Sequence, residues 1–284
     1  MGRLAPPARS GHPIRTLVIL RLLAAGAAVY WFFPRPPRYI TYGDRELLLL
    51  EDVAASTLDS AAFVPDENGW MTYRDGNITA VQGIDVSSHQ GEIDWQAVAD
   101  SGIRFAIIRA AFRGYGQEGR LVEDSRFTEN ISGALAAGLD VGVYCFSQAV
   151  TVEEAQEELA LTLDLIAPYE ITYPVVYDWE RMPADRDART HEVTGETLTA
   201  MAAAFCREAE EAGYTPAVYA NQNLAYLTLD LSQLKAWPFW LAQYSSAPTF
   251  YYRCDLWQYS HTGTVPGIQG NVDLNLAFRD FTQK

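Results

Sequence analysis

Short β-rich runs recur eight times from Val81 onward, and this recurrence limits the possible folds more than any other feature of the 284-residue chain. Stretches with the apolar spacing of amphipathic helices separate the earlier runs, whereas the later connections are too short or irregular for full helices. Alternating strands and helices favour a parallel sheet, and eight strands can close into a barrel. We therefore expect an α/β fold, a modified TIM-like (β/α) barrel whose second half is depleted in helices.

The expected elements are short and end at residues that suit their termini, as where Gly213 follows the last helical pattern. The expected strands are Val81–Val86, Phe105–Ala110, Val141–Phe146, Pro174–Asp178, Ala217–Ala220, Phe239–Gln243, Leu256–Tyr259 and Val272–Leu274, and the expected helices are Trp95–Ser101, Phe127–Ala137, Glu153–Ile166 and Glu196–Ala212.

Acidic residues lie at or near the ends of three of these runs. Asp85 is near the end of the first run, Asp178 and Glu180 close the fourth, and Asp273 lies within the last, which neighbours the first in a closed barrel. Active sites of such barrels lie at the carboxyl ends of the strands. We therefore expect these four carboxylates to converge there as catalytic residues.

Asp178 and Glu180 are two apart in an extended segment, so their side chains point to one face. Two carboxylates in a confined site cannot both ionise freely, and one is pushed towards the protonated form that a general acid needs. Cleavage of a glycosidic bond requires such an acid and a second carboxylate. Taken alone, the same pair would also suit Mg²⁺ or an arginine partner.

Aromatic residues favour a sugar ligand, because sugar rings present apolar faces that stack on them. We expect Phe146, Tyr219 and Trp257 to contact substrate, and Tyr144 and Gln243 to complete the binding set. About half of the aromatics near strand ends should instead fill the core. These aromatics are Tyr144, Phe146, Tyr219, Trp240, Tyr244, Trp257 and Tyr259.

Several other signals indicate structure more than chemistry. Ser88-His89 lacks the elbow of a serine hydrolase, and His191-Glu192 lacks a second histidine for zinc. Gly114-Tyr115-Gly116 is a turn near the expected site mouth, and the acids of 153–158 should form a solvent-exposed helix face.

The three cysteines have no metal-site spacing. Cys145 lies in an apolar run and should be a buried small hydrophobe. Cys206 and Cys254 could pair, although the spacing does not decide it.

The N-terminus predicts a membrane-targeting segment. The first 38 residues contain six arginines and no acid. Because the formal net charge of the whole chain is −15, the remainder has a formal net charge of −21. Nucleic acid is therefore not an expected partner of the main domain. Residues 17–33 are apolar except for Arg21 and approach the length that spans a bilayer. A cleaved signal peptide exiting near Ala24 to Ala28 is the alternative, but we favour an anchor with the rest of the chain outside the cytoplasm.

This organisation gives five expected regions: a cytoplasmic basic tail over 1–16, a transmembrane signal anchor over 17–33, a spacer over 34–69, a hairpin over 70–80 and the catalytic domain over 81–284. The protein is then expected at the cell membrane as a single-pass monomer, or secreted if the segment is cleaved.

Ordered motifs between Val81 and about Phe278 resemble the glycoside hydrolase family 25 lysozymes, also called Chalaropsis-type muramidases. The motifs are Gly83-Ile-Asp-Val-Ser-Ser-His-Gln-Gly91 with Ile93-Asp-Trp95, Phe105-Ala-Ile-Ile-Arg-Ala110, Ala137-Gly-Leu-Asp-Val-Gly-Val-Tyr144, Val176-Tyr-Asp-Trp-Glu180, Gly213-Tyr-Thr-Pro216, Phe239-Trp-Leu-Ala-Gln-Tyr244, Leu256-Trp-Gln-Tyr-Ser260 and Gly270-Asn-Val-Asp-Leu-Asn275.

The resemblance implies a modified (β/α) barrel that hydrolyses the β-1,4 bond from N-acetylmuramic acid to N-acetylglucosamine in peptidoglycan. It implies that Glu180 is the general acid and Asp178 its partner, with Asp85 and Asp273 beside them. It implies no metal and no cofactor. Asp178 would either orient the substrate's own 2-acetamido group or act directly as nucleophile or base. Cys145-Phe146 departs from the histidine-aromatic pair of many members, which leaves fine substrate preference open. The alternatives are a wall-glycan-binding protein without turnover and a hydrolase of another N-acetylglucosamine polymer, such as chitin.

Overall fold

The computed structural model describes residues 1, 2 and 37–283. The chain divides into two compact units, Met1–Leu49 and Leu50–Lys284. The expected transmembrane segment 17–33 lies outside the described residues. Within the residues that are described, no helix combines the length and apolarity needed to cross a membrane.

The first unit contains one described hairpin. Strands β1 (Tyr39–Tyr42) and β2 (Arg45–Leu48) pair antiparallel. Gly43 lies in the turn between them with φ of 62°, a left-handed conformation that costs glycine little. This hairpin falls inside the region expected to be a spacer with at most a short helix.

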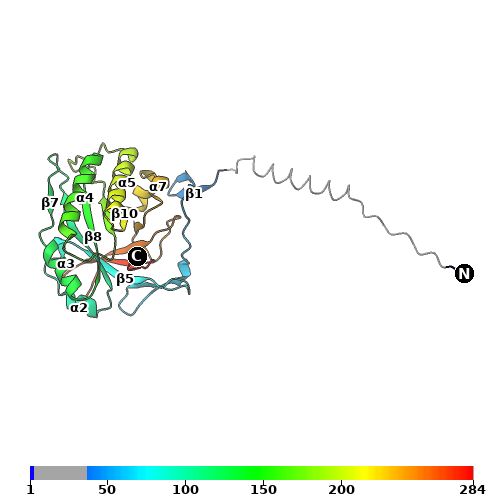
Figure 1. Ribbon diagram of the computed structural model, residues 1–284, viewed down its shortest axis with the longest axis horizontal. Helices are drawn as coiled ribbons and strands as arrows, with labels where there is room; N and C mark the ends of the chain where they lie inside the picture. Colours follow the sequence, from blue (N-terminus) through cyan, green and yellow to red (C-terminus); the bar gives the residue numbers. More distant parts are fainter. Residues whose placement is uncertain (3–36, 284) are drawn as a thin grey trace. The chain divides into compact units, whose positions relative to one another are not determined.

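Eight strands of the second unit form the closed barrel that the sequence predicts (Figure 1). Their circular order is the order of the chain, and β5 pairs with both β6 and β13 to close the ring. The barrel strands are β5 (Val81–Val86), β6 (Phe105–Arg113), β8 (Asp140–Ser147), β9 (Val175–Trp179), β10 (Pro216–Asn221), β11 (Phe239–Ala242), β12 (Leu256–Gly263) and β13 (Val272–Ala277).

The last strand runs against the rest. β5, β6 and β8 to β12 run parallel to one another, whereas β13 is antiparallel to its two neighbours, β12 and β5. The beginning of β13 therefore lies at the end of the barrel where the parallel strands terminate. Asp273, the second residue of β13, sits directly opposite Asp85 on β5.

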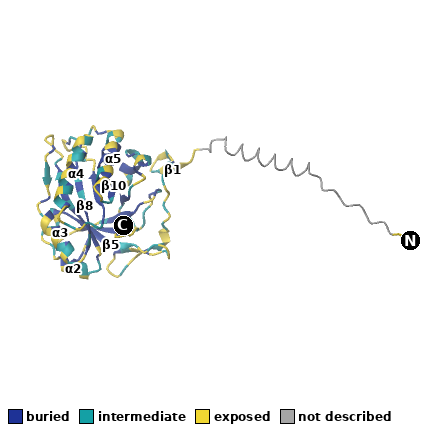
Figure 2. Cartoon of the chain, viewed as in Figure 1, coloured by how far each residue is buried: buried dark blue, intermediate teal, exposed yellow. Residues whose placement is uncertain are grey.

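Large side chains fill the barrel interior, so the barrel is a packed core and not a pore. The Phe105 ring stacks on Tyr173 with centroids 4.4 Å apart, and both are buried. A Cβ on Gly83 would come within 2.3 Å of the Phe105 ring, which explains the glycine of this motif. Figure 2 shows the strands dark blue at the centre and exposed residues on the helices and loops around them.

Helices accompany the first half of the barrel and become short in the second. The four expected helices are present as α2 (Trp95–Asp100), α3 (Phe127–Ala136), α4 (Val152–Ile166) and α5 (Gly195–Glu211). Three of them begin at a side-chain cap, from Asp94, Thr151 and Thr194. Beyond β10 only α6 (Gln222–Leu227) and α7 (Leu231–Leu234) occur in the described chain, which confirms the depleted second half.

The charged face expected over 153–158 is only partly exposed. Glu158 is fully buried against Arg113 of β6, with Nε to Oε1 at 2.7 Å. Burial raises the pKa of Glu158 to about 7, although hydrogen bonds from Ser147 and Arg113 oppose the shift. The expectation fails here because a cation on a distant strand pairs with this acid.

Residues 50–80 pack on the barrel and are not a loose spacer. β4 (Met71–Tyr73) pairs with β3 (Phe63–Pro65), which follows a 3₁₀ turn at Ser60–Ala62. The hairpin expected over 70–80 is reduced to one bridge, between Arg74 and Thr79. The Phe63 ring meets Trp257 of β12 edge-on at 5.1 Å. Because apolar residues such as Phe63 pack on the barrel, the second compact unit begins at Leu50 and not at residue 81, where the catalytic domain was expected to begin.

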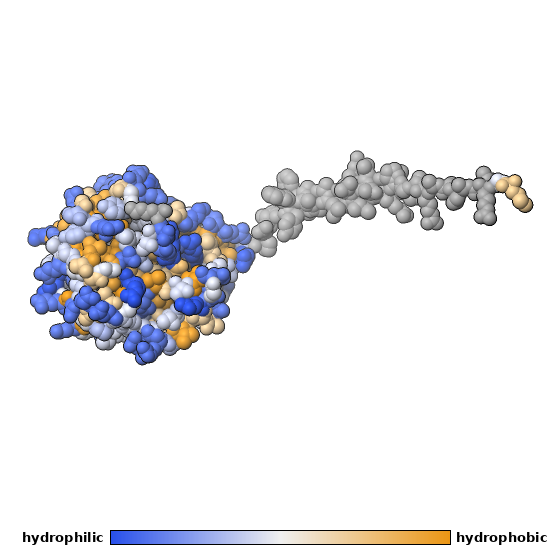
Figure 3. All heavy atoms as spheres, turned by 60° about the horizontal axis from the view of Figure 1, so that its bottom comes forward, coloured by the Kyte–Doolittle hydropathy of each residue, from blue (hydrophilic) through white to orange (hydrophobic). Residues whose placement is uncertain are grey.

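Polar residues cover much of the visible surface, with hydrophobic residues between them (Figure 3). All three cysteines are free and buried. Cys206 and Cys254 therefore do not form the disulfide that was left open, and Cys145 is the buried residue that the sequence predicts.

Candidate active site

The four predicted carboxyls meet in one pocket at the carboxyl ends of the parallel strands. The pocket has a volume of about 330 Å³ and also contains the predicted contacts Tyr144, Phe146 and Tyr219. It is lined by Asp85, His89, Arg109, Tyr144, Phe146, Asp178, Glu180, Tyr219, Trp240, Tyr244, Gln258 and Asp273.

Asp85 is buried in this pocket and accepts hydrogen bonds from side chains of two other strands, β12 and β13. Its Oδ2 accepts from Gln258 Nε2 at 2.8 Å and from Asn275 Nδ2 at 2.7 Å. Asn275 Oδ1 in turn accepts from Trp240 Nε1 at 2.9 Å. Burial and the nearby Asp273 raise the pKa of Asp85 well above its usual value, against these hydrogen bonds. Asp85 is therefore a fixed group with protein partners.

Asp273 faces Asp85 across the β5–β13 pair. Burial raises its pKa to about 6, and the charge of His261 opposes the shift. Proximity of two carboxyls favours retention of a proton between them.

Asp178 lies deeper in the pocket than Glu180. Its side chain is 7% exposed, and Oδ1 is buried without a hydrogen-bond partner in the described structure. Burial, then Glu180 and Asp85, raise its pKa well above the usual range, while the charge of Arg109 lowers it. A buried oxygen without a partner is costly unless a ligand completes its bonding.

Glu180 follows the end of β9 and is open to solvent. The protein around it still desolvates its carboxyl enough to raise the pKa, against a hydrogen bond with Tyr219. Its backbone carbonyl accepts from the buried Gln148 Nε2 at 2.7 Å. Thr190 Oγ1 donates to Oε1 of the same amide at 3.3 Å, so Gln148 ties the chain at Glu180 to the loop beyond it.

Arg109 adds one cation to the acidic pocket. Its guanidinium pairs with the buried Asp124 at 2.7 Å, and Nη2 donates to Ser88 Oγ at 3.1 Å. Burial opposes ionisation of Asp124, but hydrogen bonds from the Arg126 and Ser88 backbone and from Arg109 hold its pKa below the usual value. Ser88 thus has the structural role that the sequence predicts.

Two predicted substrate contacts lie elsewhere. Trp257 is fully buried outside the barrel, where it meets Phe63, and its Nε1 donates to the Gln243 carbonyl at 2.8 Å. Both polar atoms of the Gln243 side chain are bonded to Thr249, in the β11–β12 loop. Side chains alternate along a strand, so Gln258 points inward and Trp257 must point out.

The sequence reasoning did not select the pocket residues Gln258, Arg109 and His89, nor the buried Asn275 that donates to Asp85. Gln258 and Asn275 each lie within a quoted motif, and inward alternation from Leu256 and Asp273 could have identified them. Arg109 becomes recognisable only through its pairing with Asp124, which a linear pattern does not reveal. Within residues 37–283 no group of three or more His, Cys, Asp or Glu side chains is arranged to hold a metal ion.

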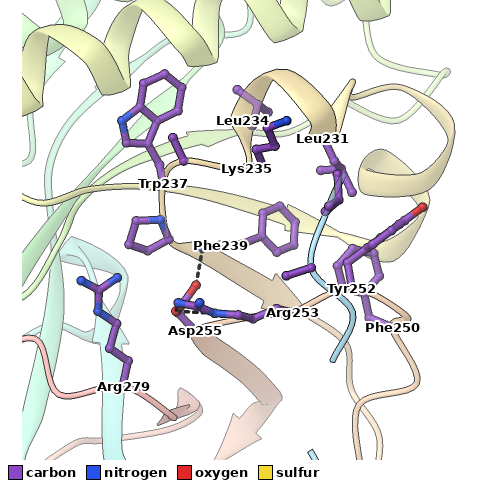
Figure 4. Close-up of a pocket in the computed structure, with 14 residues that line it drawn as sticks. Leu231, Leu234, Lys235, Trp237, Phe239, Phe250, Tyr252, Arg253, Asp255 and Arg279 are labelled. Atoms are coloured by element: carbon purple, nitrogen blue, oxygen red, sulfur yellow. Dashed lines mark hydrogen bonds and ion pairs between the residues drawn. The ribbon is translucent and has the colours of Figure 1, made fainter. Parts of the chain in front are cut away.

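A second cavity, of about 240 Å³, lies where the parallel strands begin, at the other end of the barrel (Figure 4). Its cations already have partners: Lys235 pairs with Asp52, and Arg253 pairs with Asp255. Arg279 lies over the Phe281 ring at 5.3 Å. None of the four predicted catalytic acids lines it.

Comparison with known proteins identifies the family of this chain. The model of the family described as glycosyl hydrolases family 25 matches residues 84–268. Lysozyme M1 of Streptomyces globisporus is 30% identical over 220 residues, which cover 74% of this chain and 71% of that protein. The chain belongs to family 25 of the glycosyl hydrolases, as its motifs predict.

Solved structures agree with this assignment. The bacterial lysozyme from Streptomyces coelicolor is 28% identical with a TM-score of 0.54, over 69% of this chain and 91% of that chain. The modular autolysin LytC from Streptococcus pneumoniae, solved with a synthetic peptidoglycan ligand, has a TM-score of 0.62 at 24% identity. That match covers 86% of this chain but 57% of LytC, less than two thirds of its length, and supports the fold alone.

Proposed function

We propose that this chain is a muramidase that hydrolyses the β-1,4 bond from N-acetylmuramic acid to N-acetylglucosamine in peptidoglycan, in cell-wall degradation or remodelling. The observation that carries the proposal is the convergence of Asp85, Asp178, Glu180 and Asp273 in a pocket that also presents aromatic rings. Membership of family 25 supports the reaction class, and the lysozymes among its relatives support the substrate.

Glu180 is the proton donor in this proposal. Its carboxyl is open to the pocket, where a leaving oxygen can reach it, and its raised pKa keeps the proton available nearer neutral pH. Asp178 lies beside it with an unpartnered Oδ1, which suits an N–H donor of the substrate.

That donor is the substrate's own 2-acetamido N–H. The acetamido oxygen then attacks the anomeric carbon, the glycosidic C–O bond breaks, and Glu180 protonates the departing oxygen; water later opens the cyclic intermediate with net retention. Early-time NMR of the products checks this route. An inverted anomer would contradict it and favour Asp178 as base for water.

The proposed activity is tested with the full-length protein and purified peptidoglycan, with new reducing ends identified by mass spectrometry. We expect reducing-end N-acetylmuramic acid from the parent protein and a rate loss of at least ~10² in Glu180→Gln, because a general acid is lost. Glu192→Gln, an exposed acid in the loop that follows, is the matched control and should retain the parent rate. Binding without release by the parent would favour a wall-glycan-binding protein, and release from chitin alone would favour the other polymer.

The N-terminal segment is proposed to tether this activity. The apolar run over 17–33 with its preceding arginines supports a single-pass signal anchor with the barrel outside the cytoplasm. Activity would then be confined to wall near the membrane. A mature protein free in the medium, with a new N-terminus after Ala28, would contradict the anchor.

We also propose that the enzyme acts as a monomer, because the four acids and the aromatic residues of the pocket all come from one chain. Analytical ultracentrifugation at the concentration used in the activity assay tests this proposal, and a dimer would contradict it.

A further inference from the structure

A third space, here called the annex, opens beside the catalytic pocket. It has a volume of about 640 Å³ and lies over β6, its following turn and the end of β8. His89, Arg109 and Phe146 line both spaces, so the annex and the catalytic pocket adjoin along these three residues. The annex contains none of the four acids predicted to be catalytic.

Arg109 supplies a fixed polar group where the two spaces meet. Its Nε and Nη2 are bonded to Asp124 and Ser88, whereas Nη1 has no hydrogen bond within the described residues. Asp124 is fully buried, so the guanidinium is held in place before any ligand arrives. Such a group can donate to a carbonyl or carboxylate oxygen at little entropic cost.

Aromatic rings form the annex walls. Arg109 lies over the Phe112 ring at 5.0 Å, and Phe146 lines the boundary with the catalytic pocket. Tyr115 is 42% exposed at the tip of the turn after β6. Its backbone carbonyl accepts from the Arg189 amide at 3.1 Å, which ties this turn to the loop that follows Glu180.

The strand order shows on which side of Asp178 the annex lies. Glu180 contacts Tyr219 of β10, on one side of Asp178. On the other side, Phe146 of β8 pairs in register with Asp178, and Phe112 of β6 pairs with Phe146. A sugar whose C2 acetamido group meets Asp178 has its C3 substituent one carbon further from the scissile bond, on the annex side.

We infer that the annex binds the lactyl-peptide substituent at C3 of the N-acetylmuramic acid whose bond is cleaved. Arg109 Nη1 donates to a carbonyl or carboxylate oxygen of this substituent, and its aliphatic parts pack on Phe112 and Tyr115. The inference rests on the proposed muramidase function and makes the stem peptide a determinant of specificity.

The test compares two soluble, uncrosslinked glycan preparations with the full-length protein. One carries intact stem peptides, and the other has been treated with an amidase that removes the peptides and leaves the lactyl carboxylates. We expect kcat/KM to be about tenfold higher on the peptide-bearing glycan, the scale of one added apolar contact. In Tyr115→Ala this ratio should fall towards one, through KM.

Two further variants distinguish the loss of a contact in the annex from a general effect on the structure. Tyr115→Phe keeps the ring and should keep the ratio. Val64→Ala removes an exposed apolar side chain outside the annex and should keep both the ratio and the rate.

Equal kcat/KM on both glycans, with no change in Tyr115→Ala, would overturn the annex inference and leave the muramidase standing. Failure of the parent protein to cleave either glycan would overturn both.

Discussion

Two sides of the catalytic pocket differ in how their polar groups are satisfied. On the β5, β12 and β13 side, Asp85 is bonded to Gln258 and Asn275, and the chain of hydrogen bonds continues to Trp240. On the β9 side, Asp178 keeps an unpartnered buried oxygen and Glu180 opens to solvent. On the first side the polar groups already bond to each other, whereas on the second side polar atoms remain free to bond to a substrate. Substitutions should therefore affect stability on the first side and turnover on the second.

The largest effect is expected from Asp178→Asn. We expect kcat/KM on peptidoglycan to fall about 10²- to 10³-fold, because the neutral amide cannot stabilise developing positive charge as a carboxylate does. Stability at neutral pH should be retained or increased. The folded-state pKa of Asp178 is raised above its ordinary value of 3.8. The folded protein is therefore destabilised by this group as pH rises from 3.8 to the raised pKa.

Chemical denaturation across pH measures this second effect, and Asp185→Asn, an exposed acid, is the control. A destabilised Asp178→Asn protein would show that Asp178 belongs to the scaffold.

Asn275→Leu tests the other side. Asn275 is fully buried, and its loss removes a donor to Asp85 and leaves Trp240 Nε1 without its acceptor. We expect a loss of about 2–4 kcal/mol in unfolding free energy, because the buried Trp240 Nε1 is left unsatisfied and Asp85 keeps only the hydrogen bond from Gln258. Asn271→Leu, at an exposed site in the same segment, should be nearly neutral in the same urea titration.

Gln148→Leu tests the connection between the scaffold and the acid. Without the hydrogen bond to the Glu180 carbonyl, the acid should lose its position, and kcat should fall about tenfold with little change in KM. Thr190→Val removes only the bond to the other end of this amide and should have a smaller effect. An unchanged kcat in steady-state assays of Gln148→Leu would mean that Glu180 is positioned by other contacts.

The barrel and its four acids could be predicted because both follow from local pattern plus chain order. Strand runs such as Val81–Val86 are visible in the sequence, and ring closure brings Asp273 to Asp85. Trp257 was misplaced because its side of the strand depends on register, and the neighbour that covers it, Phe63, comes from a segment interpreted as spacer. Glu158 and Arg109 depend on ion pairs with distant residues, which hydropathy patterns do not encode.

The pH dependence of kcat/KM for the parent protein and Glu180→Gln tests the central claim most directly. Activity of the parent should fall on the alkaline side as Glu180 loses its proton, at a pH above the ordinary value of 4.5 because the pKa is raised. The residual activity of Glu180→Gln should lack this alkaline limb. An alkaline limb that persists unchanged in the variant would show that another group donates the proton.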